Sequence, residues 1–252
     1  MSLRFVERPS PNFDVRGRSV DLVILHYTGM ADAESALARL TDPEPLAGRY
    51  PGPWQATDLA PEARLPRVSA HYVVDLDGTI HRLVEEKHRA WHAGAGAWGG
   101  EGDLNARSIG IEIVNGGHDF GLPDFPEAQI EAVIALVKDI LARWELKPRQ
   151  VVGHSDVAPE RKADPGEKFP WKRLAEAGVS IWPKGPLRPC VLEDPIPVMQ
   201  ERLEALGYHV KPTGLIDHET KAALMAFQRR FRPRLVNGAA DAETCALIAG
   251  LL

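Results

Sequence analysis

Two short apolar runs that each end in a histidine constrain this chain more than any other feature of its sequence. Residues 20–25 lead into His26, and residues 150–153 lead into His154. Runs of this kind are typical of strands that are buried on both faces of a sheet. Loops at strand ends often carry binding or catalytic side chains, so we expect both histidines to lie at a functional edge. The alternative for either histidine alone is a hydrogen-bonded residue of the core.

A polar loop follows His154 and is closed by Pro165 and Gly166. It carries Lys162 and Asp164. An imidazole nitrogen and a carboxylate oxygen can both bind zinc, so His154 and Asp164 would share a metal if the loop folds back. In isolation, a surface loop with a solvated Lys–Asp pair is the better interpretation, because no short metal-binding pattern has this spacing. The assignment depends on whether the chain supplies a third ligand and a base.

Periodicity elsewhere predicts an α/β domain with a mixed central sheet flanked by helices. An Asp-Gly turn at residues 77–78 joins two apolar runs and predicts a hairpin. Residues 1–19, interrupted by proline and glycine, are expected to form an extended arm. The expected strands are residues 20–25, 68–75, 79–84, 107–115 and 150–154, and the expected helices are residues 31–40, 126–146 and 170–177.

Glu112 lies inside the expected strand 107–115, between Ile111 and Ile113. A carboxylate is rare in a mostly apolar strand unless it faces solvent or a functional site. A solvent-facing position is the alternative, but the apolar surroundings favour the site. Glu112 is therefore our candidate base.

Two irregular segments are candidate ligand-binding loops. One is the proline-rich segment 41–67, which contains Trp54, and the other is the glycine-rich segment 94–105, preceded by Trp91 and His92. An aromatic face suits a sugar ring or a peptide side chain. The alternative is that each tryptophan simply anchors its loop.

Composition excludes several classes of protein. The net charge of −5 lacks the basic excess of a nucleic-acid binder. No apolar run approaches the ~20 residues of a membrane span. Cys190 and Cys245 are too few for a disulfide framework; they could pair with each other, but we expect free thiols in a reducing compartment. The first residues show no apolar signal region, so we expect a chain that is neither secreted nor lipid-anchored.

Domain boundaries follow from a run of prolines. We expect a catalytic domain at residues 1–179, a proline-rich linker at 180–197 and a helical module at 198–252. Asp217 and Asp241 are good N-caps for two of three short helices in the module. The module has no catalytic cluster, so it is expected to bind or dock.

Several short motifs together indicate a family. They are Val-Ile-Leu-His26-Tyr-Thr, Ser-Ala-His71-Tyr-Val-Val, Trp91-His92-Ala-Gly, Ser108-Ile-Gly-Ile-Glu112-Ile, Gly153-His154-Ser-Asp156 and Arg161-Lys162-Ala-Asp164-Pro165-Gly166, with Gly214-Leu-Ile-Asp217 and Ala226-Phe-Gln228-Arg-Arg-Phe231 in the tail. Through these motifs the chain resembles the zinc-dependent N-acetylmuramoyl-L-alanine amidases of the type 2 family, which are related to phage amidases and peptidoglycan-recognition proteins. The tail resembles the three-helix peptidoglycan-binding domain, and the domain order matches the branch that includes an outer-membrane amidase of Gram-negative bacteria.

The resemblance implies a role for each site residue. His26, His154 and Asp164 would hold one zinc ion per chain, where some relatives use cysteine in place of Asp164. Glu112 would act as general base, and Lys162 would steady the tetrahedral intermediate. The bond cut would join N-acetylmuramic acid to the L-alanine of the stem peptide. Further candidates for substrate contacts are Tyr27, Trp91, His92 and Arg107.

The missing export signal favours a cytoplasmic enzyme that cleaves 1,6-anhydro-muropeptides during cell-wall recycling. The main alternative is a periplasmic or outer-membrane amidase that acts on intact peptidoglycan. A recognition protein that binds muropeptide without cutting it is a second alternative, although such relatives lose a zinc ligand. A different zinc amidase, such as a peptidase, is disfavoured because the chain lacks a His-Glu-x-x-His motif. The sequence predicts no oligomeric state.

Overall fold

The computed structural model describes residues 3–50, 59–185 and 195–252. The expected loop 41–67 and the expected linker 180–197 fall partly outside these ranges, as do Trp54 and Cys190. No helix within the described part is long and apolar enough to cross a membrane.

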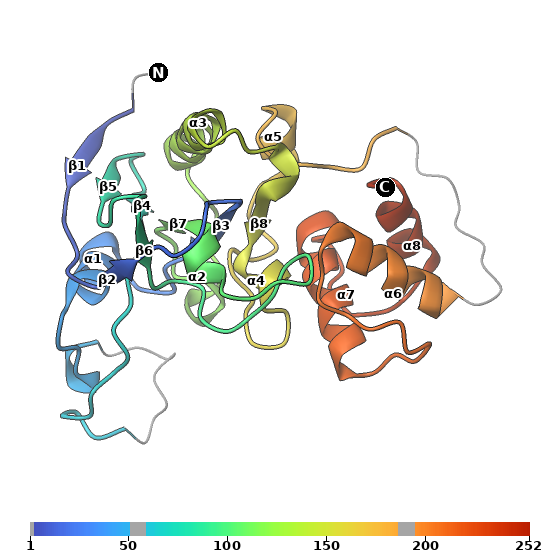
Figure 1. Cartoon of the computed structure of the whole chain (residues 1–252), viewed down its shortest axis with the longest axis horizontal. Helices are drawn as coiled ribbons and strands as arrows, with labels where there is room; N and C mark the ends of the chain where they lie inside the picture. The colour runs from blue at the N-terminus through green and yellow to red at the C-terminus, as the bar shows by residue number, and fades with distance from the viewer. Residues whose placement is uncertain (1–2, 51–58, 186–194) are drawn as a thin grey trace.

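A six-stranded mixed sheet forms the centre of the molecule (Figure 1). Its order is β1 (Phe5–Glu7), β5 (Ile80–Arg82), β4 (Tyr72–Val74), β7 (Ser108–Ile113), β3 (Leu22–Tyr27) and β8 (Val151–Gly153). Only the β4–β5 hairpin is antiparallel within it. The predicted mixed sheet is therefore confirmed.

The N-terminal arm is more regular than its sequence suggested. It contributes β1 at the edge of the main sheet, and β2 (Phe13–Val15) pairs antiparallel with β6 (His88–Ala90). The arm is extended in these two segments, as expected, and β-pairing with segments that are distant in sequence makes them strands.

Helices cover both faces of the sheet. The apolar side chains of β3 alternate between the two faces, so each face has side chains to bury. Val23 and Leu25 face one core, which includes Ile130 and Val137 of α3 (Glu127–Arg143). The remaining helices of this domain are α1 (Ala33–Thr41), α2 (Leu104–Arg107), α4 (His154–Val157) and α5 (Trp171–Glu176), with short 3₁₀ turns η1 (Ala47–Arg49), η2 (His118–Phe120) and η3 (Pro148–Gln150). The side chain of Asp32 caps α1 by accepting a hydrogen bond from the Ser35 amide.

The opposite face of the sheet packs against the C-terminal module, which we define as residues 195–252. It contains α6 (Pro195–Leu206), α7 (His218–Phe231) and α8 (Ala242–Ala249), and its helix α7 lies beside α4 (Figure 1). Leu22 and Ile24 of β3 share one core with Leu203 and Phe227 of the module. The module is therefore part of the body of the molecule.

The C-terminal module bears on two expectations, the helix N-caps at Asp217 and Asp241 and the free thiol of Cys245. Asp217 and Asp241 accept hydrogen bonds from the amides of Thr220 and Thr244, as predicted. The expectation of free thiols is wrong for Cys245, because this buried residue of α8 is disulfide-bonded.

Candidate metal centre and active site

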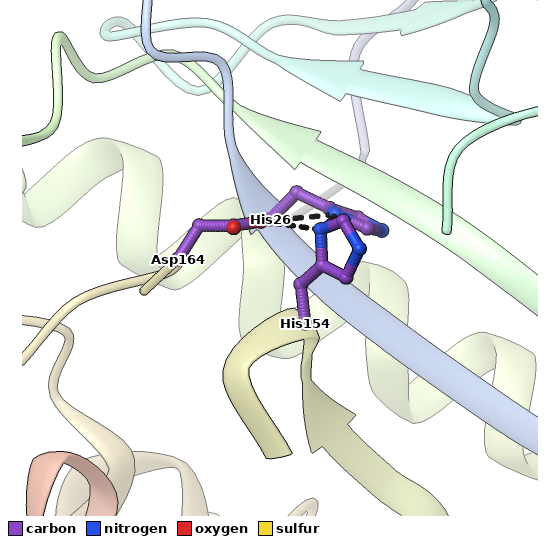
Figure 2. A group of neighbouring side chains, drawn as sticks. All are labelled: His26, His154 and Asp164. Atoms are coloured by element: carbon purple, nitrogen blue, oxygen red, sulfur yellow. Dashed lines mark hydrogen bonds and ion pairs between the residues drawn. The ribbon is translucent and has the colours of Figure 1, made fainter. Parts of the chain in front are cut away.

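Two parallel strands bring the histidines together. His26 lies near the end of β3, and His154 opens α4 directly after β8, the parallel neighbour of β3. Asp164 comes from the loop that follows α4, which folds back as the sequence required. Figure 2 shows the three side chains converging on one point.

The distances between the converging atoms fit a metal centre. The Nδ1 atoms of His26 and His154 are 2.9 Å apart, and Oδ2 of Asp164 lies 3.1 Å from the first and 3.0 Å from the second. Ligands about 2.0–2.1 Å from a tetrahedral zinc ion are separated by roughly 3.3 Å. All three side chains are buried. The set is thus close to the geometry that zinc requires.

The outer nitrogens of both histidines determine their tautomers. Nε2 of His154 donates to the Ala93 carbonyl at 2.9 Å, so its Nδ1 carries a lone pair. Nε2 of His26 lies 3.0 Å from Nδ1 of His92, whose own Nε2 lies 3.2 Å from the Ser108 hydroxyl. That hydroxyl donates to the Leu104 carbonyl. In this series of hydrogen bonds every donor has an acceptor if His26 and His154 each direct an Nδ1 lone pair at Asp164.

His92 has a partner within the protein at each ring nitrogen, and its predicted contact with substrate stays a prediction. It lies at the edge of the pocket, but both ring nitrogens are bonded within the protein, so it orients His26. Gly110 makes this possible, because a Cβ at this position would lie 2.4 Å from Cγ of His92. The side chain of Asn105 fixes the same segment by accepting hydrogen bonds from the amides of His92 and Ala93.

Burial and neighbouring charges shift the pKa values of His26 and Asp164 in directions that favour binding of a cation. Burial, together with the charge of His154, lowers the pKa of His26 to about 4. Burial alone would raise the pKa of Asp164, but His154 and His26 lower it well below its usual range. Neutral imidazoles and an ionised carboxylate are the protonation states in which these groups bind metal.

A pocket of about 590 Å³ opens above the cluster. Glu112 lines it from β7, next to β3, and its Oε2 is shielded from solvent with no hydrogen-bond partner among the described residues. Burial, and then the Asp164 carboxylate, raise the pKa of Glu112 well above its usual range. Lys162 is exposed at the same pocket. A carboxyl group and a lysine side chain thus line the same pocket as the three converging side chains.

Tyr27 and Trp91 line this pocket, but Arg107 does not. Arg107 lies where β7 begins, at the end of the sheet away from His26. Its guanidinium binds the Asp21 carboxylate at 2.7 Å and the Trp98 carbonyl at 3.0 Å. Arg107 thus lies away from this pocket, at the opposite end of β7, and its predicted contact with substrate has no support from the pocket lining.

Two polar residues were missed from the sequence: His118, which lines the pocket, and its partner Glu167. His118 lies 3.0 Å from the Tyr27 hydroxyl through Nδ1, and its Nε2 lies 2.9 Å from Oε2 of Glu167. Both residues lie in irregular segments that follow no apolar period. Only their proximity to Glu112 and Asp164 in the chain gave any signal.

Two families of known proteins match the chain. The N-acetylmuramoyl-L-alanine amidase family matches residues 16–167, and the peptidoglycan binding domain family matches residues 193–248. The N-acetylmuramoyl-L-alanine amidase AmiD of Escherichia coli K12 is 37% identical over 98% of this chain and 90% of its own.

Two solved structures are similar over nearly the whole chain. One is Escherichia coli AmiD in complex with the substrate anhydro-N-acetylmuramic acid-L-Ala-D-gamma-Glu-L-Lys. It has a TM-score of 0.76 and 38% identity, covering 95% of this chain and 91% of that one. The other is AmpDh3 from Pseudomonas aeruginosa in complex with an anhydromuramic pentapeptide. It has a TM-score of 0.73 and 34% identity, covering 92% of this chain and 91% of that one.

Proposed function

Because the chain belongs to the N-acetylmuramoyl-L-alanine amidase family, we propose that it hydrolyses the amide between N-acetylmuramic acid, in its 1,6-anhydro form, and the L-alanine of the stem peptide. One observation carries the proposal: the lone pairs of His26, His154 and Asp164 converge in an open pocket that Glu112 also lines, with its Oε2 lacking a hydrogen-bond partner among the described residues. Such a site suits metal-assisted hydrolysis rather than binding alone.

The cofactor is proposed to be one zinc ion per chain, held by His26, His154 and Asp164. Three protein ligands of this kind leave one position open, which is the arrangement of catalytic rather than structural zinc. A zinc ion held there would polarise the scissile carbonyl and lower the pKa of a water molecule.

The residues around the cluster supply the remaining steps. Glu112 accepts a proton from the attacking water, and its raised pKa brings it closer to the operating pH. As the carbonyl carbon becomes tetrahedral, the ammonium group of Lys162 stabilises the negative charge on its oxygen. Glu112 then returns the proton to the leaving nitrogen. The C–N bond breaks, leaving a carboxylic acid on the lactyl group and a free amine on L-alanine.

Support for the 1,6-anhydro substrate comes from the two similar structures, which were solved with anhydro-muramyl peptides. In this chain, Trp91 lines the pocket, and an aromatic side chain suits contact with a sugar ring. Hydrolysis of such soluble fragments places the enzyme in cell-wall recycling. We propose, as the sequence predicts, a catalytic domain at residues 1–179, a linker at residues 180–197 and a helical module at residues 198–252; the C-terminal module as defined above adds the first turn of α6, residues 195–197.

The disulfide of Cys245 bears on the compartment. Disulfides persist in oxidising compartments and are rare in the cytosol. This supports the periplasmic alternative over the cytoplasmic expectation. Cell fractionation tests it, together with a count of free thiols under denaturing conditions: recovery with cytosolic markers and two free thiols would refute it.

Product analysis tests the function. Purified anhydro-N-acetylmuramyl tetrapeptide and intact sacculi would be incubated with wild type, with Glu112→Ala and with a chelated sample. We expect wild type to release peptide with a free L-alanine amine from the soluble substrate, and both other samples to be inactive. Efficient release from sacculi would favour the envelope amidase that acts on intact peptidoglycan. Tight binding without cleavage of either substrate would favour a recognition protein.

A further inference from the structure

A buried ion pair joins the C-terminal module to the segment that carries His154. Nη1 of Arg230, on α7, lies 2.7 Å from Oδ2 of Asp156, on α4, and their side chains are 3% and 1% exposed. The hydroxyl of Tyr208, also from the module, donates to Oδ1 of the same carboxylate at 2.7 Å. Two residues of the module therefore hold a side chain that is two positions from a proposed metal ligand.

Asp156 in turn holds the backbone that enters α4. Its Oδ2 accepts a hydrogen bond from the Gly153 amide at 2.8 Å, and His154 follows Gly153 directly. Arg230 also donates through Nη2 to the Val151 carbonyl at 2.9 Å, where β8 begins. The module thus fixes both ends of the segment from β8 into α4, and this segment aims the imidazole of His154.

The neighbouring arginine of α7 reaches the other side of the site. Nε of Arg229 lies 3.6 Å from Oε2 of Glu167, three residues beyond Asp164. Glu167 accepts a hydrogen bond from His118, which accepts one from the Tyr27 hydroxyl at the rim of the pocket. Two consecutive residues of α7 therefore contact the two segments that flank the metal cluster.

We propose that α7 is a positioning element of the proposed metal centre: Arg230 sets the segment of His154, and Arg229 adds a longer ion pair, without a hydrogen bond from its Nε, to Glu167 beyond Asp164. Replacing a buried ion pair by apolar residues often leaves stability unchanged or higher, so stability alone does not explain the pair of Arg230 with Asp156. Its position explains it better, because the pair determines where α4 begins. The C-terminal module on this account is required by the catalytic site and is not a detachable wall-binding unit.

Zinc affinity of the full-length chain tests the proposal through a readout that is independent of turnover. We expect Arg230→Met to weaken zinc binding on the order of tenfold in a chelator competition, the lower end of the effect of outer-sphere changes. Arg232→Met is the matched control, because Arg232 is equally buried and pairs with Asp241 inside the module. The control is expected to lower the melting temperature while leaving zinc affinity unchanged.

Tyr208→Phe provides a second variant that keeps the packing and removes only the hydroxyl on Asp156. We expect it to weaken zinc binding less than Arg230→Met does, and to lower kcat with little change in KM. Arg230→Lys should recover part of the affinity, because it restores the charge but not the contacts to Val151. Equal zinc affinities in wild type, Tyr208→Phe and Arg230→Met would overturn the proposal. So would a loss in Arg232→Met as large as that in Arg230→Met.

Discussion

His26 of β3 and Glu112 of β7 occupy paired positions on adjacent parallel strands. Residues in register on neighbouring strands project from the same face of a sheet, so the pairing alone places a metal ligand beside the proposed base. A slip of one residue would send one of the two to the other face. The register of two buried strands therefore sets the spacing between metal and base.

Substitution of the proposed base should separate catalysis from metal binding. We expect Glu112→Gln to lower kcat by about 10²–10⁴-fold, the contribution typical of general acid–base catalysis. Zinc content should stay at one ion per chain, since Glu112 is not among the converging ligands. Steady-state kinetics and metal analysis of the same sample check this. Wild-type turnover in the variant would remove Glu112 from the mechanism.

The same substitution should stabilise the metal-stripped protein in a pH-dependent way. The folded-state pKa of Glu112 is raised, so the folded protein binds more protons than the unfolded chain between the two pKa values. Stability of the wild type therefore falls as the pH rises through the folded pKa, and glutamine removes this loss. In a chain of this size, 1 kcal/mol changes the melting temperature by about 2–4 °C. We expect Glu112→Gln to gain more over wild type at pH 8 than at pH 4; equal differences at both pH values would contradict the account.

Lys162 should act on the transition state more than on substrate binding. We expect Lys162→Met to reduce kcat by roughly 10²–10³-fold with a small change in KM, as for loss of an oxyanion donor. Lys168→Met is the matched control, because Lys168 pairs with Asp124 on the surface. If both variants lost the same small fraction of activity, Lys162 would have no special role.

His92 should influence the metal without touching it. We expect His92→Phe to weaken zinc affinity about 10–100-fold, because His26 loses the partner that fixes its tautomer. Gly110→Ala should have a similar effect, since the added Cβ would occupy the position of the His92 ring. Chelator competition checks both, with the exposed His209→Asn as control. Unchanged affinity in both variants would show that His26 needs no outer partner.

The sequence predicted the parts of this molecule that depend on local pattern. The strands that end in His26 and His154, the hairpin at residues 77–78 and the Asp217 cap all follow from periodicity or from short-range hydrogen bonding. The grouping of His26 with Asp164 did not follow from spacing, because 138 positions separate them. Only the resemblance to a family selected it.

Long-range packing accounts for what the sequence did not predict. Arg107 is close in sequence to Glu112 but lies at the other end of β7, away from the pocket, and only the path of the strand shows this. His118 and Glu167 lie in irregular segments whose paths depend on tertiary contacts. The contact between Arg230 and Asp156 spans 74 positions, and no local pattern in either segment indicates its partner.

The central claim is that His26, His154 and Asp164 hold one zinc ion on which amide hydrolysis depends. Zinc content and turnover of anhydro-N-acetylmuramyl tetrapeptide, measured together during stepwise addition of zinc to the stripped protein, test it most directly. Activity is predicted to rise in proportion to zinc and to reach its maximum at one ion per chain, with Asp164→Ala neither retaining zinc nor gaining activity. Full turnover in the stripped protein, or undiminished zinc binding and activity in Asp164→Ala, would contradict the claim.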